Sequence, residues 1–228
     1  MADAGVQELN NHKFYFPDSS LNRQTTYKRW FREPVYFLDH EDNIWIGFGY
    51  GEWGGDLFVF NIPSRHFIIP RLGNFNIELN PVKSICSDGE KVFVSTGLQH
   101  REFSGSIIEF DHFLARTILA SRLEMDMNNK PVEGEYIGPA TFNKADHSIY
   151  FYSQNGIFKG NPEKDLSAVG MWEKVVSPEL YWSSGQPDAI GSPMNVLKME
   201  FANEGTLVFL SQLNGVGIYD GKTITLIR

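Results

Sequence analysis

A chain of 228 residues with 42% hydrophobic and 14% aromatic side chains is long and apolar enough to bury a sizeable core. Its 20 Lys and Arg against 28 Asp and Glu give a formal net charge of −8, which argues against binding to nucleic acids or to anionic membrane surfaces. The single cysteine, Cys86, excludes an intrachain disulfide and a multi-thiolate metal site. No stretch approaches the ~18 apolar residues of a membrane-spanning helix, and the first residues lack the regions of a secretory signal.

The first 33 residues contain two strand-like segments, 13–16 and 25–30. Residues 34–80 then hold four such segments, at 35–38, 44–46, 55–61 and 65–69, separated by Asn, Asp and Gly residues that favour tight turns. The same succession of segments and turns returns in residues 81–135, 136–193 and 194–228. The second segments of the four units share a short apolar run, and these runs begin at intervals of 48, 57 and 58 residues: Ile44–Ile46, Val92–Val94, Ile149–Phe151 and Leu207–Phe209.

Four strands recurring four times predict an all-β fold, a β-propeller of four four-stranded blades. A single small sheet cannot bury both apolar faces, so neighbouring sheets must stack around an axis. A β-sandwich is the alternative, but it does not require the same four-strand cadence four times. The segments in residues 1–33 are then outer strands of a partial blade, and the ring is either small or incomplete. Open blade edges predict self-association, or a place within a larger propeller.

The first unit carries the sequence Asp42-Asn43-Ile44-Trp45-Ile46-Gly47, followed by Gly54-Gly55-Asp56-Leu57-Phe58-Val59-Phe60. This resembles the propeller repeat of two-component regulators, whose pattern is D-G/N-x-W-apolar-G followed by G-G-apolar-x-aromatic. The other units keep the outline, with Phe93, Tyr150 and Phe209 approximating the tryptophan. The resemblance implies an extracytoplasmic sensor or binding propeller, usually part of a much longer chain. The lack of a secretory signal sequence in the first residues instead predicts a cytoplasmic protein.

Propellers usually bind ligands at the loops between second and third strands and at the loops between blades. The glycine-rich loop 47–55 carries aromatic rings that either stack on a sugar or other planar ligand or pack on the next blade. Loop 97–105 carries a histidine, an arginine and a glutamate. The histidine could act as a general base, the arginine could bind an anionic group of a ligand, and the glutamate could orient the histidine. The predicted ligand-binding residues are Tyr50, Glu52, Trp53, His100, Arg101, Glu102, Tyr136, Tyr181 and Trp182.

These features favour a non-catalytic, sensor-like module that recognises a carbohydrate, another small ligand or a protein through its blade-connecting loops. One alternative is a propeller lyase or hydrolase with His100 as base beside Glu102 or Glu135; another is a fragment of a larger propeller protein. No cofactor is expected. The histidines lack metal-ligand spacing and the acidic linker 124–136 lacks the spacing of an EF-hand, so no metal site is predicted.

Overall fold

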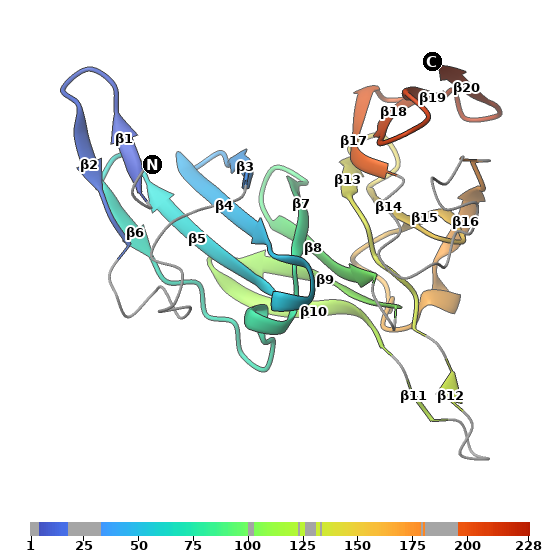
Figure 1. Cartoon of the computed structure of the whole chain (residues 1–228), viewed down its shortest axis with the longest axis horizontal. Coiled ribbons are helices and arrows are strands. Elements are labelled where there is room, and N and C mark those ends of the chain that lie inside the picture. Colours follow the sequence, from blue (N-terminus) through green and yellow to red (C-terminus); the bar gives the residue numbers. More distant parts are fainter. Residues whose placement is uncertain are drawn as a thin grey trace.

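Four antiparallel four-stranded sheets follow one another along the chain in the computed structural model (Figure 1). The structure describes residues 5–17, 33–99, 103–122, 124–125, 131–132, 134–178, 180 and 196–228. Blade 1 comprises β3 (Val35–Leu38), β4 (Asn43–Gly49), β5 (Gly55–Asn61) and β6 (His66–Ile68); blade 2 comprises β7 (Val82–Ser87), β8 (Val92–Gln99), β9 (Phe103–Asp111) and β10 (Leu114–Ser121). Blade 3 comprises β13 (Ala140–Asn143), β14 (Ser148–Ser153), β15 (Gly156–Gly160) and β16 (Glu173–Val176); blade 4 comprises β17 (Val196–Asn203), β18 (Thr206–Ser211), β19 (Val216–Tyr219) and β20 (Ile224–Ile227).

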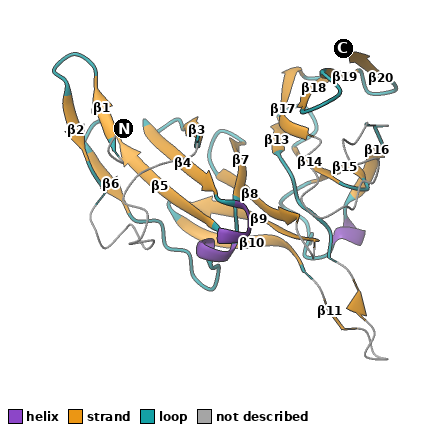
Figure 2. Cartoon of the chain, in the orientation of Figure 1, coloured by secondary structure: helices purple, strands orange, loops and turns teal. Residues whose placement is uncertain are grey.

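The remaining elements are small (Figure 2). Two hairpins, β1 (Val6–Glu8) with β2 (Lys13–Tyr15) and β11 (Glu124–Met125) with β12 (Pro131–Val132), lie outside the blades. The helical turns within the described residues are three single 3-10 turns, η1 (Gly51–Trp53), η2 (Ile77–Leu79) and η3 (Val169–Met171). The predicted all-β propeller of four four-stranded blades is therefore confirmed, and a sandwich of two facing sheets is not what forms.

Short polar side chains shape the turn between the first and second strands of every blade. In blade 1 the Asp39 carboxylate accepts the backbone N–H groups of Glu41 and Asn43, each at 2.9 Å. Such a side-chain acceptor mimics a backbone turn, which is why Asp and Asn favour these positions. The same interaction recurs in the other blades, and the four acceptors are Asp39, Asp88, Asn143 and Asn203.

The Asp39 turn also holds the largest core residue, because its second carboxylate oxygen accepts the indole N–H of Trp45 at 2.8 Å. Partial burial raises the pKa of Asp39, but the hydrogen bonds from Trp45 and from the turn outweigh burial and hold the pKa below its ordinary value. A carboxyl group with a lowered folded-state pKa stabilises the fold above its unfolded pKa, and this contribution is lost as the pH falls through the folded pKa.

We therefore expect Asp39→Asn to flatten the acid limb of the stability profile. Asparagine keeps the turn, as Asn143 and Asn203 do in their blades, but carries no charge to be titrated. Urea unfolding followed by circular dichroism from neutral pH to about pH 2, below the ordinary aspartate pKa of about 3.9, provides the measurement. Wild type should lose stability more steeply than the variant over that range. Glu41→Gln, at the exposed neighbouring position, is the control, and equal acid slopes for wild type and Asp39→Asn would refute the assignment.

Side-chain alternation along the second strand sets how the blades pack. Each second strand carries an apolar run of three residues, and successive strand residues face opposite sides of a sheet. The middle residue of the run therefore points toward the following blade, and the residues before and after it point toward the preceding blade. In blades 1 to 3 the middle residue is aromatic and its ring lies against a ring of the next blade: Trp45 and Phe110 (centroids 5.1 Å apart), Phe93 and Phe142 (5.9 Å), and Tyr150 and Phe201 (4.9 Å). The repeat seen in the sequence is thus the repeat of the blade interfaces.

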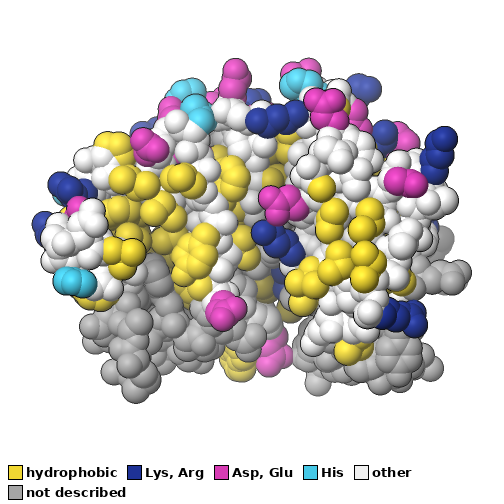
Figure 3. Space-filling model, turned by 90° about the horizontal axis from the view of Figure 1, so that it is seen from above, with side chains coloured by type: hydrophobic (Ala, Val, Ile, Leu, Met, Phe, Trp, Pro, Cys, Tyr) yellow, Lys and Arg dark blue, Asp and Glu magenta, His cyan; other side chains and the backbone are white. Residues whose placement is uncertain are grey.

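The four blades form an arc that does not close into a ring. Apolar clusters join each blade to the next one, but among the described residues none joins blade 4 back to blade 1. An opening separates the innermost strands β3 and β17 (Figure 1), and Figure 3 looks into this opening from above. The incomplete form of the ring, one of the two forms that the sequence allowed, is the one observed.

The hairpin β1–β2 lies on the outer part of blade 1. The Tyr15 ring is 5.4 Å from that of Phe60, and the Arg65 guanidinium meets the Glu8 carboxylate at 3.1 Å. The segment predicted at 13–16 is thus a strand, but its partner is β1 rather than a strand missing from the chain. The segment predicted at 25–30 lies outside the described residues.

Candidate functional site

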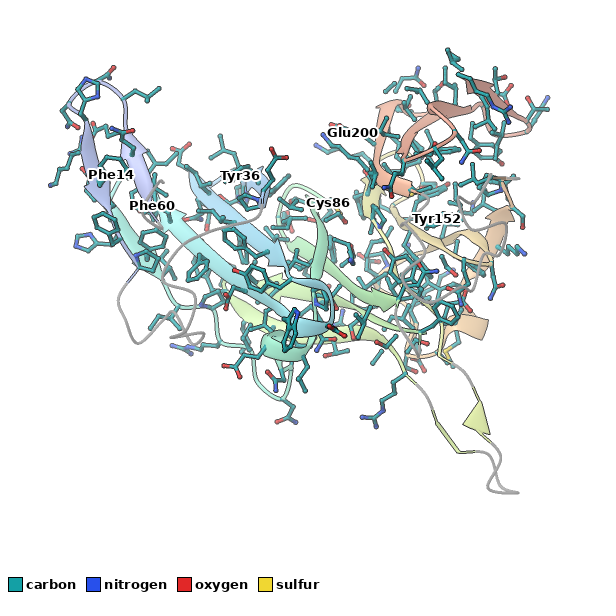
Figure 4. All side chains as sticks on the ribbon, viewed as in Figure 1. Phe14, Tyr36, Phe60, Cys86, Tyr152 and Glu200 are labelled. Carbon is teal, nitrogen blue, oxygen red and sulfur yellow. The ribbon has the colours of Figure 1, made fainter. Side chains whose placement is uncertain are left out.

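A cavity of about 730 Å³ lies where the innermost strands of the four blades meet. Each blade contributes its first strand, β3, β7, β13 or β17, and the segment just before β3 completes the lining. Tyr36 of β3, Cys86 of β7 and Glu200 of β17 surround the opening (Figure 4). The volume falls within the range of about 300–1,000 Å³ that is usual for small-molecule sites. We call this space the axial cavity.

The lining of the axial cavity is apolar with a few charged groups. The Tyr36 ring stands on β3 with 62% of its surface exposed, and partial burial together with the negative charge of Glu33 raises its pKa, so its hydroxyl stays protonated at neutral pH. Across the cavity, the ammonium of Lys198 lies 3.2 Å from the carboxylate of Glu200. Lys83 of β7 adds a second cation. Rings, ammonium groups and carboxylates together suit a ligand that has both apolar faces and hydroxyl or charged groups.

The wall between blades 2 and 3 is held by a buried polar link. The Ser84 hydroxyl accepts the backbone N–H of Ala140 at 2.6 Å and lies 2.9 Å from its carbonyl oxygen. It also lies 2.7 Å from the Ser95 hydroxyl. Cys86 is buried beside this link, and burial and the charge of Asp88 raise the pKa of its thiol to about 12, as expected for an inert thiol. The Ser84 hydrogen bonds thus tie the first strands of blades 2 and 3 together on this side of the cavity.

Two of the aromatic residues predicted for the loops are buried. Tyr50 is 4% exposed: its ring stacks on Phe48, and its hydroxyl donates to the Asp56 carboxylate at 3.1 Å. Tyr136 is 1% exposed, in the cluster between blades 3 and 4. Burial raises the pKa of both phenols. Neither tyrosine presents its ring to solvent. Both rings pack inside the protein instead of forming a surface on which a ligand could stack.

The other predicted residues divide into two groups. Glu52 and Trp53 are exposed on η1, with 64% of the Trp53 surface accessible. His100, Arg101, Glu102, Tyr181 and Trp182 lie outside the described residues. Glu135, the other carboxylate considered as a partner of His100, accepts the Asn155 amide at 2.9 Å and the Ser153 hydroxyl. Glu135 therefore holds the β14–β15 turn.

The axial residues were missed by the sequence analysis, which assigned ligand binding to loops. A signal was present, because Lys198 and Glu200 alternate with the apolar residues Leu197, Met199 and Phe201 in a predicted strand. The two charged side chains therefore share one sheet face, opposite the face that packs in the core. Within the described residues, no group of three or more His, Cys, Asp and Glu is placed to hold a metal ion, and no helix there is long and apolar enough to cross a membrane.

No protein-family model and no curated protein matches this sequence. Solved structures do match in fold. Two structures of the extracellular domain of BT4673 from B. thetaiotaomicron, described as a one-component and as a hybrid two-component system, align with TM-scores of 0.53, at 13% and 11% identity, over 95% of this chain. The U3-55K structure aligns with a TM-score of 0.50 at 10% identity over 86% of this chain and 52% of its own.

This chain spans about a quarter of the BT4673 extracellular domain, 25% and 24% in the two structures. At such identities the likeness establishes the fold alone. The chain is therefore a β-propeller, similar in architecture to the extracellular domain of BT4673. The resemblance to two-component-regulator propellers that the first unit predicts is confirmed at the level of the fold.

Proposed function

We propose that this propeller is a non-catalytic binding module of an extracytoplasmic sensor, and that it takes a small amphipathic ligand, with a carbohydrate as the first candidate, in the axial cavity. The observation that carries the proposal is the cavity itself, about 730 Å³ at the junction of four blades. The similarity to an extracellular sensor domain supports the same class of function and the same location.

The lining supplies the two kinds of contact that a sugar uses. Sugar rings have apolar C–H faces that pack on aromatic rings, and the exposed Tyr36 ring offers such a surface. Sugar hydroxyls donate to carboxylates and accept from ammonium groups, and Glu200 and Lys198 stand opposite Tyr36. Their ion pair is exposed at 72% and 70%, so exchanging it for ligand hydrogen bonds costs little.

The loops supply a second set of contacts in this proposal. Glu52 and Trp53 are exposed on η1 between β4 and β5. The two sets give different mutational outcomes, so one experiment separates them.

We expect Tyr36→Ala to weaken ligand binding by about tenfold or more, equivalent to about 1.4 kcal/mol. The probes are neutral and acidic oligosaccharides, screened by ligand-observed NMR, with the best binder titrated by calorimetry. Lys198→Ala should weaken binding in the same assay. Trp53→Ala is the matched aromatic variant on the loop.

If Trp53→Ala abolishes binding while Tyr36→Ala binds as wild type, the loops and not the axial cavity are the site. If no oligosaccharide binds, the carbohydrate assignment fails. Circular dichroism should show unchanged folding for all three variants, because each replaces a side chain that is more than half exposed.

A further inference from the structure

Among the described residues, no blade packs on the face of blade 1 that points away from blade 2. Tyr36 of β3 pairs with Ile46 of β4, and Leu38 pairs with Ile44. Because directly paired residues of neighbouring strands point to the same side of a sheet, these four side chains share one face, opposite to Trp45. In blades 2 to 4 the equivalent residues of the second strand are buried against the blade before. In blade 1 they need another cover.

The hairpin β1–β2 covers the outer part of this face. Val6 packs on the buried cluster of β4 and β5, and the Tyr15 ring lies 5.4 Å from that of Phe60. Toward β3 this cover ends, and Tyr36 and Leu38 are 62% and 57% exposed. A groove of about 490 Å³ therefore lies between β1 and β3. Seen from above, apolar side chains gather on this side of the opening (Figure 3).

The lining of this groove is mainly aliphatic. The aliphatic side chains are Val6, Leu38, Ile44, Ile46 and Ile62. The polar side-chain groups of the lining are the Gln7 amide and the Tyr36 hydroxyl, and none of the described residues that line the groove carries a charge. The axial cavity, in contrast, has two carboxylates and two ammonium groups in its lining. The groove thus suits a hydrocarbon group, and the axial cavity suits a polar one.

The groove and the axial cavity adjoin at β3. Tyr36 and Phe37 belong to the lining of both spaces, and Tyr36 stands beside the opening (Figure 4). A ligand that contacts the Tyr36 ring in the axial cavity is therefore next to the groove. The volume of the groove, about 490 Å³, also falls within the range of about 300–1,000 Å³ that is usual for small-molecule sites.

We propose that the ligand carries a hydrocarbon chain, which lies in the groove between β1 and β3 while the polar head of the ligand occupies the axial cavity. This inference rests on the proposed function, which assigns the head group to the axial cavity. The ligand class is then an alkyl or acyl derivative of a sugar. Tyr36 contacts both parts of this ligand, and Leu38 and Ile62 contact the chain alone.

Calorimetric titration with methyl, butyl and hexyl β-glucoside tests the proposal. A methylene group that leaves water for an apolar site strengthens binding by up to about fourfold. Because the groove is open on one side, we expect about twofold per methylene in wild type, or about 30-fold from methyl to hexyl. Leu38→Ser should reduce this gain by at least about threefold, whereas Leu114→Ser, at a similarly exposed leucine of β10 outside both linings, should retain it. Equal affinities for the three glucosides, or the full gain in Leu38→Ser, would overturn the proposal.

Two further measurements separate this result from the proposed function. Lys198→Ala removes a contact to the head group alone, so it should weaken all three glucosides by the same factor and leave the gain with chain length unchanged. 1-Hexanol probes the groove without a sugar: NMR contacts between its chain and the methyl groups of Ile44 and Ile46, lost in Leu38→Ser, would support the groove even if no glucoside bound. Failure of both hexyl glucoside and 1-hexanol to bind would refute the hydrocarbon chain, and methyl glucoside binding would then still support the proposed function.

Discussion

Replacing Trp45 by alanine is expected to destabilise the fold by about 3–5 kcal/mol, the range for truncating a buried aromatic side chain. Trp45 is 1% exposed and is the largest fully buried side chain of the described residues. Its ring lies between those of Phe110, at 5.1 Å, and Phe113, at 5.8 Å, both in blade 2. The substitution would therefore open a cavity inside the interface of blades 1 and 2 and leave the Asp39 carboxylate without its indole partner.

Two further variants divide this effect into its parts. Trp45→Phe keeps an aromatic ring in the interface but loses the N–H donor, so we expect a cost of about 1.5–3 kcal/mol, that of one hydrogen bond to a charged group. Trp53→Ala, at a tryptophan that is 64% exposed, should change stability by less than about 0.5 kcal/mol. Urea unfolding followed by far-UV circular dichroism suits all three, and a cost below about 1 kcal/mol for Trp45→Ala would contradict the packing described here.

The strands and their grouping into blades were predictable because the signals that define them are local. Alternating apolar residues define the strands, and the Asp or Asn at each turn accepts backbone N–H groups as its residue type predicts, as Asp39 and Asn143 do. The directional packing was also present in the sequence, since Trp45, Phe93 and Tyr150 occupy the same place in their units. Whether the arc closes depends instead on the angle between blades, which many small packing contacts determine together.

The candidate site was harder to predict because exposure is not a local property. Tyr50 and Trp53 stand three residues apart in one glycine-rich loop, yet the first is 4% exposed and the second 64%. Tyr50 is drawn inward because its hydroxyl finds a buried acceptor, Asp56, six residues away. The axial cavity is a product of four strands distant in the chain, and β17 acquires its partners in the cavity only when the blades assemble.

The glycines of the second and third strands have a steric role that the sequence analysis did not identify. Gly97 of β8 and Gly105 of β9 are paired across the strands, and the backbone of Ile137, in the linker to blade 3, lies directly on them. A Cβ atom on Gly97 would lie 1.9 Å from the Ile137 carbonyl oxygen, and one on Gly105 would lie 2.4 Å from the Ile137 Cβ. The pair Gly49 and Gly55 lies in the same way under the linker from blade 1 to blade 2.

Gly97→Ala should accordingly destabilise the protein by about 3 kcal/mol, at the upper end of the cost of overpacking, because the obstructing atom is backbone and not the end of a flexible side chain. The linker that carries Ile137 would have to move, and with it the first strand of blade 3 and the wall of the axial cavity. Gly170→Ala is the matched control: a Cβ there meets nothing within 4 Å, and its stability should equal that of wild type within about 0.5 kcal/mol. Urea midpoints measured side by side decide the matter, since equal midpoints for Gly97→Ala and Gly170→Ala would mean that the linker does not cross β8 as closely as the fold requires.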